Sequence, residues 1–180
     1  MGWMGAVQHS NKTRAFAGAA AVYATQSDFC RLFKEDMRGL YLLSLLLMAD
    51  PEQAERCFVA GLDDCINGNP VFRDWGYAWG RRAIMRNAIR TVFSSSGSAR
   101  PTTSIVSTNQ EWKQLADSPI SAVIKLEPLE RLSFVMSLLE GYSDQECSIL
   151  LNRSRTEVVA ARTRALQHLA ERGCNVSVLK

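Results

Sequence analysis

Histidine is scarce in this sequence, and the residue patterns that carry most enzyme chemistry are missing from it. The 180 residues include only two histidines, His9 and His168, which lie far apart. The sequence has neither the G-x-S-x-G pattern that presents a nucleophilic serine nor a glycine-rich phosphate loop. It also has no grouping of carboxylates that suggests a catalytic cleft. We therefore expect no enzyme activity, no catalytic residue, no cofactor and no small-molecule substrate.

The cysteines follow no pattern typical of a metal site or a disulfide framework. Their number is odd and no two have C-x-x-C spacing; they are Cys30, Cys57, Cys65, Cys147 and Cys174. Cys57 and Cys147 lie among apolar neighbours at helical spacing, where a free thiol packs as a small hydrophobic group. We expect free thiols in a reducing cytoplasm and no bound metal.

Long apolar runs are missing as well. The longest uncharged apolar run covers residues 39–49, whereas a membrane-spanning helix needs roughly 20 apolar residues. Residues 1–25 lack the compact basic start and continuous apolar stretch of a signal peptide. We therefore expect a leader over residues 1–25, no membrane partner and a cytoplasmic protein. The formal net charge of +3 is too small to indicate a nucleic-acid partner by itself.

Helical periodicity runs through almost the whole chain, and no alternation of apolar and polar residues lasts long enough for a strand. The pattern predicts an all-α fold. Asp50 can cap a helix that has Pro51 at its first position, and the Asn-Gly-Asn-Pro sequence at residues 67–70 is typical of a turn. We expect three helices in the first half, over residues 27–48, 51–66 and 71–93.

A serine-rich stretch divides the chain into two parts. Residues 94–118 open with Ser-Ser-Ser-Gly-Ser and contain Pro101, a composition typical of a flexible linker. Helical periodicity then resumes. We expect two small helical domains joined by this linker: a leader over 1–25, a first domain over 26–93, the linker over 94–118, a second domain over 119–173 and a tail over 174–180.

The second domain carries the signals of a helix-turn-helix. A helix from Pro128 is expected to end at Glu140, where Gly141 supplies a left-handed cap. Two capping boxes follow at residues 143–146 and 154–157, in which a serine hydroxyl and a glutamate each satisfy an exposed backbone N–H. Two capped helices separated by a tight turn are what DNA reading requires, because the first crosses the backbone and the second enters the major groove.

The last helix of this domain is basic. Arg155, Arg162 and Arg164 carry guanidinium groups that can bind phosphates or guanine edges. The alternative is a plain three-helix bundle with solvated arginines, and the residues alone leave both open. Arg162 lies on the apolar side of its helix, so it either extends outward to solvent or pairs with a carboxylate such as Glu130 or Glu140.

An aromatic and basic stripe is expected on the helix over 71–93. At about 100° per residue its members fall within roughly 80° of arc; they are Trp75, Trp79, Arg82, Arg86 and Arg90. Rings beside guanidinium groups suit a single strand with exposed bases. The alternative is that the tryptophans pack in the core and the arginines are solvated. We favour core packing for each tryptophan and nucleic-acid binding for the arginine row.

The sequence resembles the extracytoplasmic-function sigma factors of bacterial RNA polymerase. Residues 126–151 (LEPLERLSFVMSLLEGYSDQECSILL), followed by Arg164-Ala165-Leu166 and Leu169, are similar to the region-four domain of that family. Similarity to region two rests on Leu40-Tyr41, Asp50-Pro51-Glu52, Ala54-Glu55 and Ile84-x-Arg86-Asn87. Together these segments cover most of residues 28–172 and occur in the family's order.

The resemblance implies a region-two three-helix bundle that binds core polymerase and the melted downstream promoter element, and a region-four helix-turn-helix that binds the upstream element. The partners implied are promoter DNA and RNA polymerase core, with an anti-sigma factor as a further candidate. Polymerase contacts are expected at Glu52, Glu55, Arg56 and Val59. DNA contacts are expected at Arg153, Arg155, Thr156, Ala160, Thr163, Arg164, Trp75, Trp79, Arg82, Arg86, Asn87 and Arg90.

Three alternatives stay open. The family usually has an acidic residue and a glutamine where this chain has Arg56 and Val59, so a helix-turn-helix regulator that does not bind polymerase is possible. Positions that often hold Thr, Lys and Arg are occupied here by Glu157, Val159 and Ala161, which allows a protein-interaction module that no longer binds DNA. The third, an enzyme on a helical scaffold, has no residues to nominate.

Overall fold

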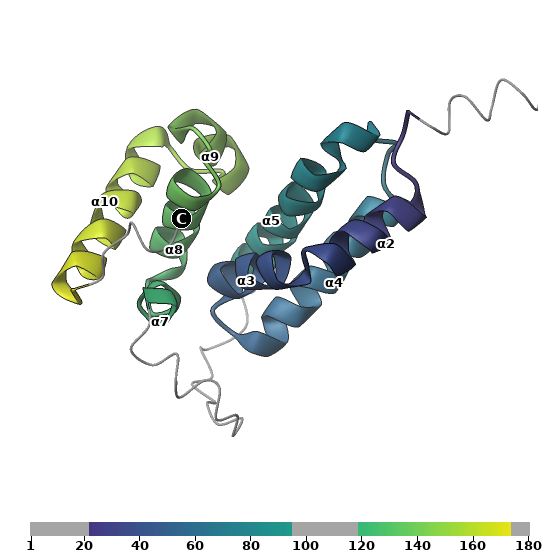
Figure 1. The fold of residues 1–180 in the computed structure, drawn as a ribbon. Helices are drawn as coiled ribbons and strands as arrows, with labels where there is room; N and C mark the ends of the chain where they lie inside the picture. The colour runs from purple at the N-terminus through teal and green to yellow at the C-terminus, as the bar shows by residue number, and fades with distance from the viewer. Residues whose placement is uncertain (1–21, 95–118, 174–180) are drawn as a thin grey trace, which may run out of the picture.

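A computed structural model describes residues 22–94 and 119–173 of the chain (Figure 1). The described part is all-α, as predicted, with one isolated β-bridge between Tyr23 and Phe72. Most of the expected leader, the linker beyond residue 94 and the tail over 174–180 lie outside the described residues. None of the described helices is long and apolar enough to cross a membrane. The helices are α2 (Gln26–Glu35), α3 (Met37–Met48), α4 (Pro51–Asn67), η1 (Arg73–Trp75), α5 (Gly76–Ser94), α7 (Pro119–Ile124), α8 (Pro128–Phe134), η3 (Val135–Leu139), α9 (Asp144–Leu151) and α10 (Arg155–Glu171).

The helix expected over residues 27–48 is in fact two helices. The chain leaves helical geometry at Asp36 (φ −108°, ψ 33°), which separates α2 from α3. The Asp36 carboxylate lies over Gly39, where a Cβ would come within 2.4 Å of Oδ1, and it accepts a hydrogen bond from the Tyr77 hydroxyl at 2.9 Å. The prediction of one continuous helix was therefore wrong, and the partner that Asp36 has at this break lies 41 residues further along the chain, where periodicity gives no sign of it.

The helix expected from residue 71 begins later, at Gly76. The Ala24 N–H donates to the Val71 carbonyl at 2.8 Å, and the Arg73 N–H donates to the Val22 carbonyl at 2.9 Å. These bonds form the antiparallel bridge on both sides of Phe72, and they hold the backbone extended there. A short 3₁₀ turn then leads into α5.

The local signals in the second half of the chain are confirmed. The Ser143 and Ser154 hydroxyls each accept a hydrogen bond from the backbone N–H three residues later, and the glutamate at that position accepts one from the backbone N–H of the serine, so both capping boxes are present. Gly141 has a φ of +73°, as expected for a left-handed cap. The helix expected from Pro128 to Glu140 is present, and its last part, η3, is a π-helical segment.

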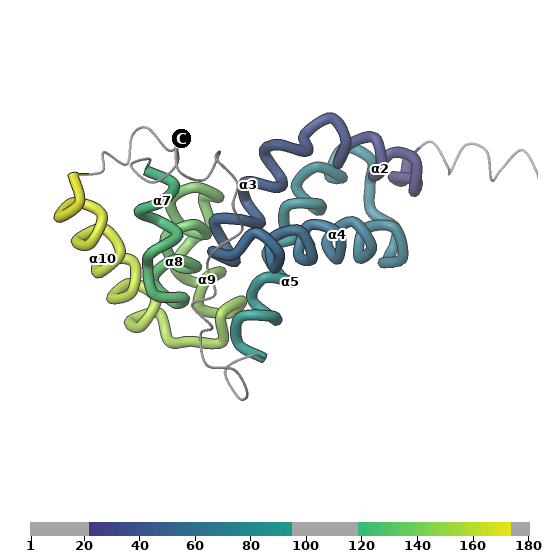
Figure 2. Tube along the Cα trace, turned by 90° about the horizontal axis from the view of Figure 1, so that it is seen from below, coloured from purple at the N-terminus to yellow at the C-terminus, as the bar shows by residue number. Residues whose placement is uncertain are grey.

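The helices form two groups that contact each other: a first group (α2–α5) and a second group (α7–α10). Both views show them side by side, with α3 against α7 and α8 and α5 against α9 (Figure 2). Cys57 is buried in the first group and Cys147 in the second, as predicted, and burial raises the pKa of Cys57 to about 12. The largest fully buried side chains include Phe33, Leu40, Leu47, Ile84, Leu132, Phe134, Val158 and Leu169.

Candidate nucleic-acid interface

Helices α9 and α10 are joined by a tight turn. Asn152 caps α9 in the left-handed conformation, with a φ of 51°, and Ser154 opens α10 two residues later. The Glu157 carboxylate accepts hydrogen bonds from the hydroxyl and the backbone N–H of Ser154, and these bonds lower the pKa of Glu157. The same arrangement of Ser143 with Glu146 opens α9. The first residue of each helix is therefore set by a capping box formed within that helix's own first turn.

The side of α10 that faces away from α8 is open. The buried residues of α10, on its opposite side, are Val158, Ala161, Ala165 and Leu169. Among the residues expected to contact DNA, the exposed ones on α10 are Arg155, Thr156, Ala160, Thr163 and Arg164. Because Ala161 has no exposed surface, a DNA contact there is excluded by packing. The expected residues are therefore all exposed and spread over about half of the circumference of α10, with Arg155 and Arg164 at its two limits.

Two of the arginines on α10 are held by carboxylates of neighbouring helices. Arg162 pairs with a carboxylate, one of the two outcomes left open, and its partner is Asp144 at the start of α9 rather than Glu130 or Glu140. Glu130 is 5% exposed and instead pairs with Arg164, whose Nε lies 2.9 Å from Oε1, and with His168, whose Nδ1 lies 3.1 Å from Oε2. Arg162 therefore ties α10 to α9, and Arg164 ties it to α8.

Arg153, in the turn before α10, is exposed and lies over an aromatic ring of the first group. Its guanidinium carbon is 5.6 Å from the centroid of the Phe93 ring on α5. This distance is within the range of a cation–π contact. The residue thus belongs to the helix-turn-helix and also contacts the other helix group.

The expected stripe on α5 is only partly exposed. Arg82 and Arg90 are exposed, and Arg90 lies 4.0 Å from the Asp64 carboxylate. Arg86 is half-buried, with its guanidinium carbon 5.0 Å from the centroid of the Trp79 ring. Trp79 packs against the core, as we favoured. The arginine row is therefore accessible at its two ends.

Asn87 cannot serve as the expected DNA contact in this structure. Its side chain is 7% exposed, and Nδ2 donates to Asp64 Oδ2 at 2.9 Å and to the Ala83 carbonyl at 3.0 Å. Both donors of the amide are used within the first helix group. Asn87 thus links α5 to α4, and the DNA-contact prediction was wrong for this residue.

An exposed aromatic cluster, formed by Tyr23, Phe72 and Trp75, lies before α5. The rings of Tyr23 and Phe72 are stacked with centroids 5.1 Å apart, and Trp75 meets the Phe72 ring edge-on at 5.1 Å. Trp75 is 63% exposed, so the expectation of core packing was wrong for it. Sequence reasoning missed Tyr23 and Phe72 because a bridge between distant residues leaves no periodic signal.

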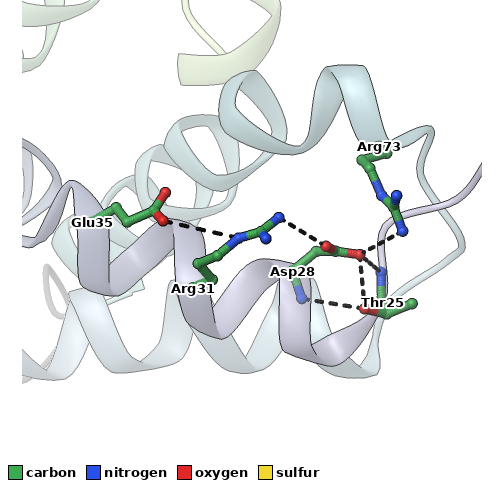
Figure 3. A network of polar contacts seen from close by, with 5 residues as sticks. All are labelled: Thr25, Asp28, Arg31, Glu35 and Arg73. Atoms are coloured by element: carbon green, nitrogen blue, oxygen red, sulfur yellow. Dashed lines mark hydrogen bonds and ion pairs between the residues drawn. The ribbon is translucent and has the colours of Figure 1, made fainter.

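A polar network holds the backbone of this cluster in position (Figure 3). Asp28 accepts hydrogen bonds from the backbone N–H and hydroxyl of Thr25, which lower the pKa of Asp28. The same carboxylate accepts a bond from Arg73 at 3.2 Å and another from Arg31 at 3.1 Å. Because Arg73 lies between Phe72 and Trp75 in sequence, the network ties the cluster to the first turn of α2.

The four expected polymerase contacts share one exposed face of α4. Glu52, Glu55, Arg56 and Val59 have the i, i+3, i+4, i+7 spacing of a single helix side, and all four are exposed. Glu52 and Arg56 form an ion pair with each other. The opposite side of α4 is buried against α3 and α5.

No group of three or more His, Cys, Asp or Glu side chains within residues 22–94 and 119–173 could hold a metal ion. No protein-family model, no curated protein and no solved structure matches the chain.

Proposed function

We propose that this chain is a sigma factor that directs bacterial RNA polymerase to promoters. In this proposal α2–α5 bind core polymerase and the melted downstream strand, and α9–α10 bind the upstream promoter element. The observation that carries it is the capped α9–α10 pair, in which one side of α10 is exposed. The first helix group, which precedes this pair in the chain, has exposed aromatic and basic residues.

The exposed face of α10 supports duplex binding. A helix of 17 residues is long enough to lie in a major groove, and its first turn carries the exposed Arg155 and Thr156. Arginine can bind a guanine edge with two hydrogen bonds or a phosphate as a charge-assisted pair. Arg155 would then contact DNA first, Thr163 would follow about two turns further along, and Arg164 would contact it from the edge of the exposed surface that lies next to α8.

The aromatic cluster supports capture of an unpaired strand. Trp75 is 63% exposed; the Phe72 ring contacts it edge-on, and the Tyr23 ring stacks on Phe72. Each base stacked on an aromatic side chain contributes about 1–3 kcal/mol in known binders. Arg73, next in sequence to Phe72 and about half exposed, adds a positive charge for the strand's backbone.

The exposed face of α4 supports docking of a large protein partner. It combines the apolar Val59 with the charged Glu52, Glu55 and Arg56, the mixture typical of non-obligate interfaces. In the proposed mechanism this face docks on core polymerase, α10 holds upstream DNA, and the aromatic cluster holds the separated strand. The polymerase supplies all the chemistry, so the chain needs no catalytic residue.

A second candidate is a helix-turn-helix regulator that binds DNA without polymerase. The ion pair between Glu52 and Arg56 favours it, because it satisfies within α4 charges that a partner would otherwise pair. Retention of core polymerase on the tagged chain separates the two candidates. The sigma-factor proposal predicts that wild type retains the core and that Val59→Asp and Glu55→Arg lose it.

The matched control is Glu35→Arg, which makes the same charge change on the exposed end of α2, away from the α4 face. This variant is expected to retain polymerase as wild type does. Failure of the wild-type chain to retain core polymerase, while it still shifts duplex DNA, would favour the regulator.

A further inference from the structure

The two helix groups are joined along a seam, defined here as the contacts of α7–α9 with α3 and α5. We infer that this seam is a closed latch, centred on Arg81 and Glu140, that competes with nucleic acid for the arginines beside it. The competition rests on the proposed function, whereas closure of the latch does not.

The centre of the latch is a two-point ion pair. Arg81 on α5 donates from Nε to Glu140 Oε2 at 2.8 Å and from Nη2 to Oε1. The Glu140 side chain is only 7% exposed, and its hydrogen bonds raise the pKa of Arg81, which therefore stays charged. Arg81 is in turn held by the Tyr77 hydroxyl, which accepts from Nη1 at 3.1 Å. A fork-to-carboxylate pair in this geometry is specific as well as strong.

A second contact crosses the seam at Arg131. Its Nε donates to the Leu47 carbonyl at the end of α3 at 3.2 Å, and Nη1 donates to the Leu126 carbonyl at 2.9 Å. Burial lowers the pKa of Arg131 to about 10, and its guanidinium donates to backbone carbonyls, including those of Leu47 and Leu126. A buried cation whose hydrogen bonds go to neutral carbonyls carries a desolvation penalty, which the nearby charge of Glu127 offsets only in part and which water would relieve. This contact therefore limits the stability of the closed form and makes opening possible.

Two residues expected to bind DNA face the other group across this seam. Arg153 lies over the Phe93 ring, and the pair lines a groove of about 390 Å³ between α5 and α9. The hydrogen bonds from Ser143 lower the pKa of Glu146 at the start of α9, and the positive charge of Arg82 on α5 adds to that lowering. In the closed form these two cations interact with the chain's own ring and carboxylate. A strand that binds them through phosphates must replace those interactions, so binding and closure oppose each other.

Both groups belong to one chain, so closure is an intramolecular step with a high effective concentration. A few contacts suffice under that condition, and breaking one of them shifts the population of the open form. Coupling of this kind typically changes affinity by about five-fold or more. We therefore expect loss of the ion pair to favour both an expanded chain and tighter binding of nucleic acid.

The test is a charge swap in the full chain, using Arg81→Glu, Glu140→Arg and the double variant. Small-angle X-ray scattering measures the radius of gyration, and fluorescence anisotropy measures affinity for a single-stranded oligonucleotide. Each single variant is expected to expand, and the double variant is expected to return to the wild-type radius. Arg81→Glu is expected to bind the oligonucleotide about five-fold more tightly or better, although it removes a positive charge.

Arg38→Glu is the matched control, because Arg38 is an exposed arginine on α3 outside the latch. This variant makes the same charge change and is expected to keep the wild-type radius and to bind no more tightly. Glu140→Gln, which removes only the charge, carries the test if Arg81→Glu does not melt cooperatively. A wild-type radius for the single variants overturns the latch, and expansion without tighter binding overturns the competition. If the wild-type and variant chains all fail to bind nucleic acid, the proposed function fails, and the scattering still decides whether the latch exists.

Discussion

Arg164 on α10 donates from Nε to Oε1 of Glu130 on α8 at 2.9 Å, so the carboxylate that fixes this arginine comes from the buried side of the neighbouring helix. Arg164 remains 51% exposed and lies on the open face of α10. The same residue therefore positions α10 and presents positive charge on its exposed surface.

Replacing Arg155 or Arg164 with alanine is expected to weaken duplex binding in both cases, and only Arg164→Ala is expected to lower the stability of the fold as well. Each loss of a phosphate contact reduces the slope of log affinity against log salt by about 0.9. Arg164→Ala should also destabilise the fold by about 1 kcal/mol, because buried Glu130 loses a charged partner, whereas Arg155→Ala should change stability by less than about 0.5 kcal/mol. Anisotropy titrations over a salt series and urea unfolding measure the two effects. An unchanged slope in both variants would remove these arginines from the interface.

Replacing Trp75, before α5, is expected to weaken single-strand binding, whereas replacing Trp79, within α5, is expected to lower the stability of the fold. Trp75→Ala should cost about 1–3 kcal/mol of single-strand affinity, the usual contribution of one stacked base. Trp79→Ala should instead lower the free energy of unfolding, because its ring packs against the core beneath Arg86. Oligonucleotide anisotropy and urea unfolding on both variants check this division. Equal loss of affinity in the two variants would contradict a binding role specific to Trp75.

Gly61 is expected to resist replacement although it lies within a helix. A Cβ there would come within 2.6 Å of Ile84 Cγ1 and 3.2 Å of the Ile84 backbone, so α4 and α5 would have to separate. Overpacking of this kind costs about 1–3 kcal/mol, which exceeds the gain of about 1 kcal/mol in helix propensity. Gly76→Ala is the control, since its nearest neighbour is 3.8 Å away. Urea unfolding should show Gly61→Ala to be the less stable variant, and a stabilised Gly61→Ala would contradict the packing.

The capping boxes are expected to make the second helix group sensitive to acid. Hydrogen bonds from Ser143 lower the pKa of Glu146, and those from Ser154 lower the pKa of Glu157. Because the folded pKa of each lies below the unfolded one, the stabilisation is complete above the unfolded pKa and is lost as the pH falls through the folded pKa. Glu146→Gln with Glu157→Gln keeps hydrogen-bonding side chains that do not titrate, so the acid side of the stability curve should flatten. Thermal melts between about pH 3 and 6 measure this, and an acid limb as steep as that of wild type would show that other groups cause it.

Features that depend on adjacent residues could be predicted from the sequence. The serine and glutamate of each capping box are three residues apart, and the left-handed cap at Gly141 needs only the glycine itself. The start of α4 at Asp50 and Pro51 is a local feature of the same kind. Helical periodicity predicted the all-α class, and these local signals predicted where α4, α9 and α10 begin.

Features that depend on distant partners could not be predicted. Asp36, at the break between α2 and α3, is hydrogen-bonded to the distant Tyr77, and the extended backbone at Phe72 is bridged to the segment around Tyr23. Asn87 matches a family motif, but its neighbour Asp64 on α4 decides that it is buried. Sequence periodicity identifies which side of a helix is apolar, whereas it does not identify what that side meets. The partners of Arg162 and Glu140 were missed for the same reason.

Transcription reconstituted from purified core polymerase, this chain and genomic DNA fragments tests the central claim most directly. The sigma-factor proposal predicts transcripts with defined start sites that appear only when the chain is added, and fewer of them with Trp75→Ala or Arg155→Ala. Core polymerase that gives the same transcripts with and without the chain would contradict it.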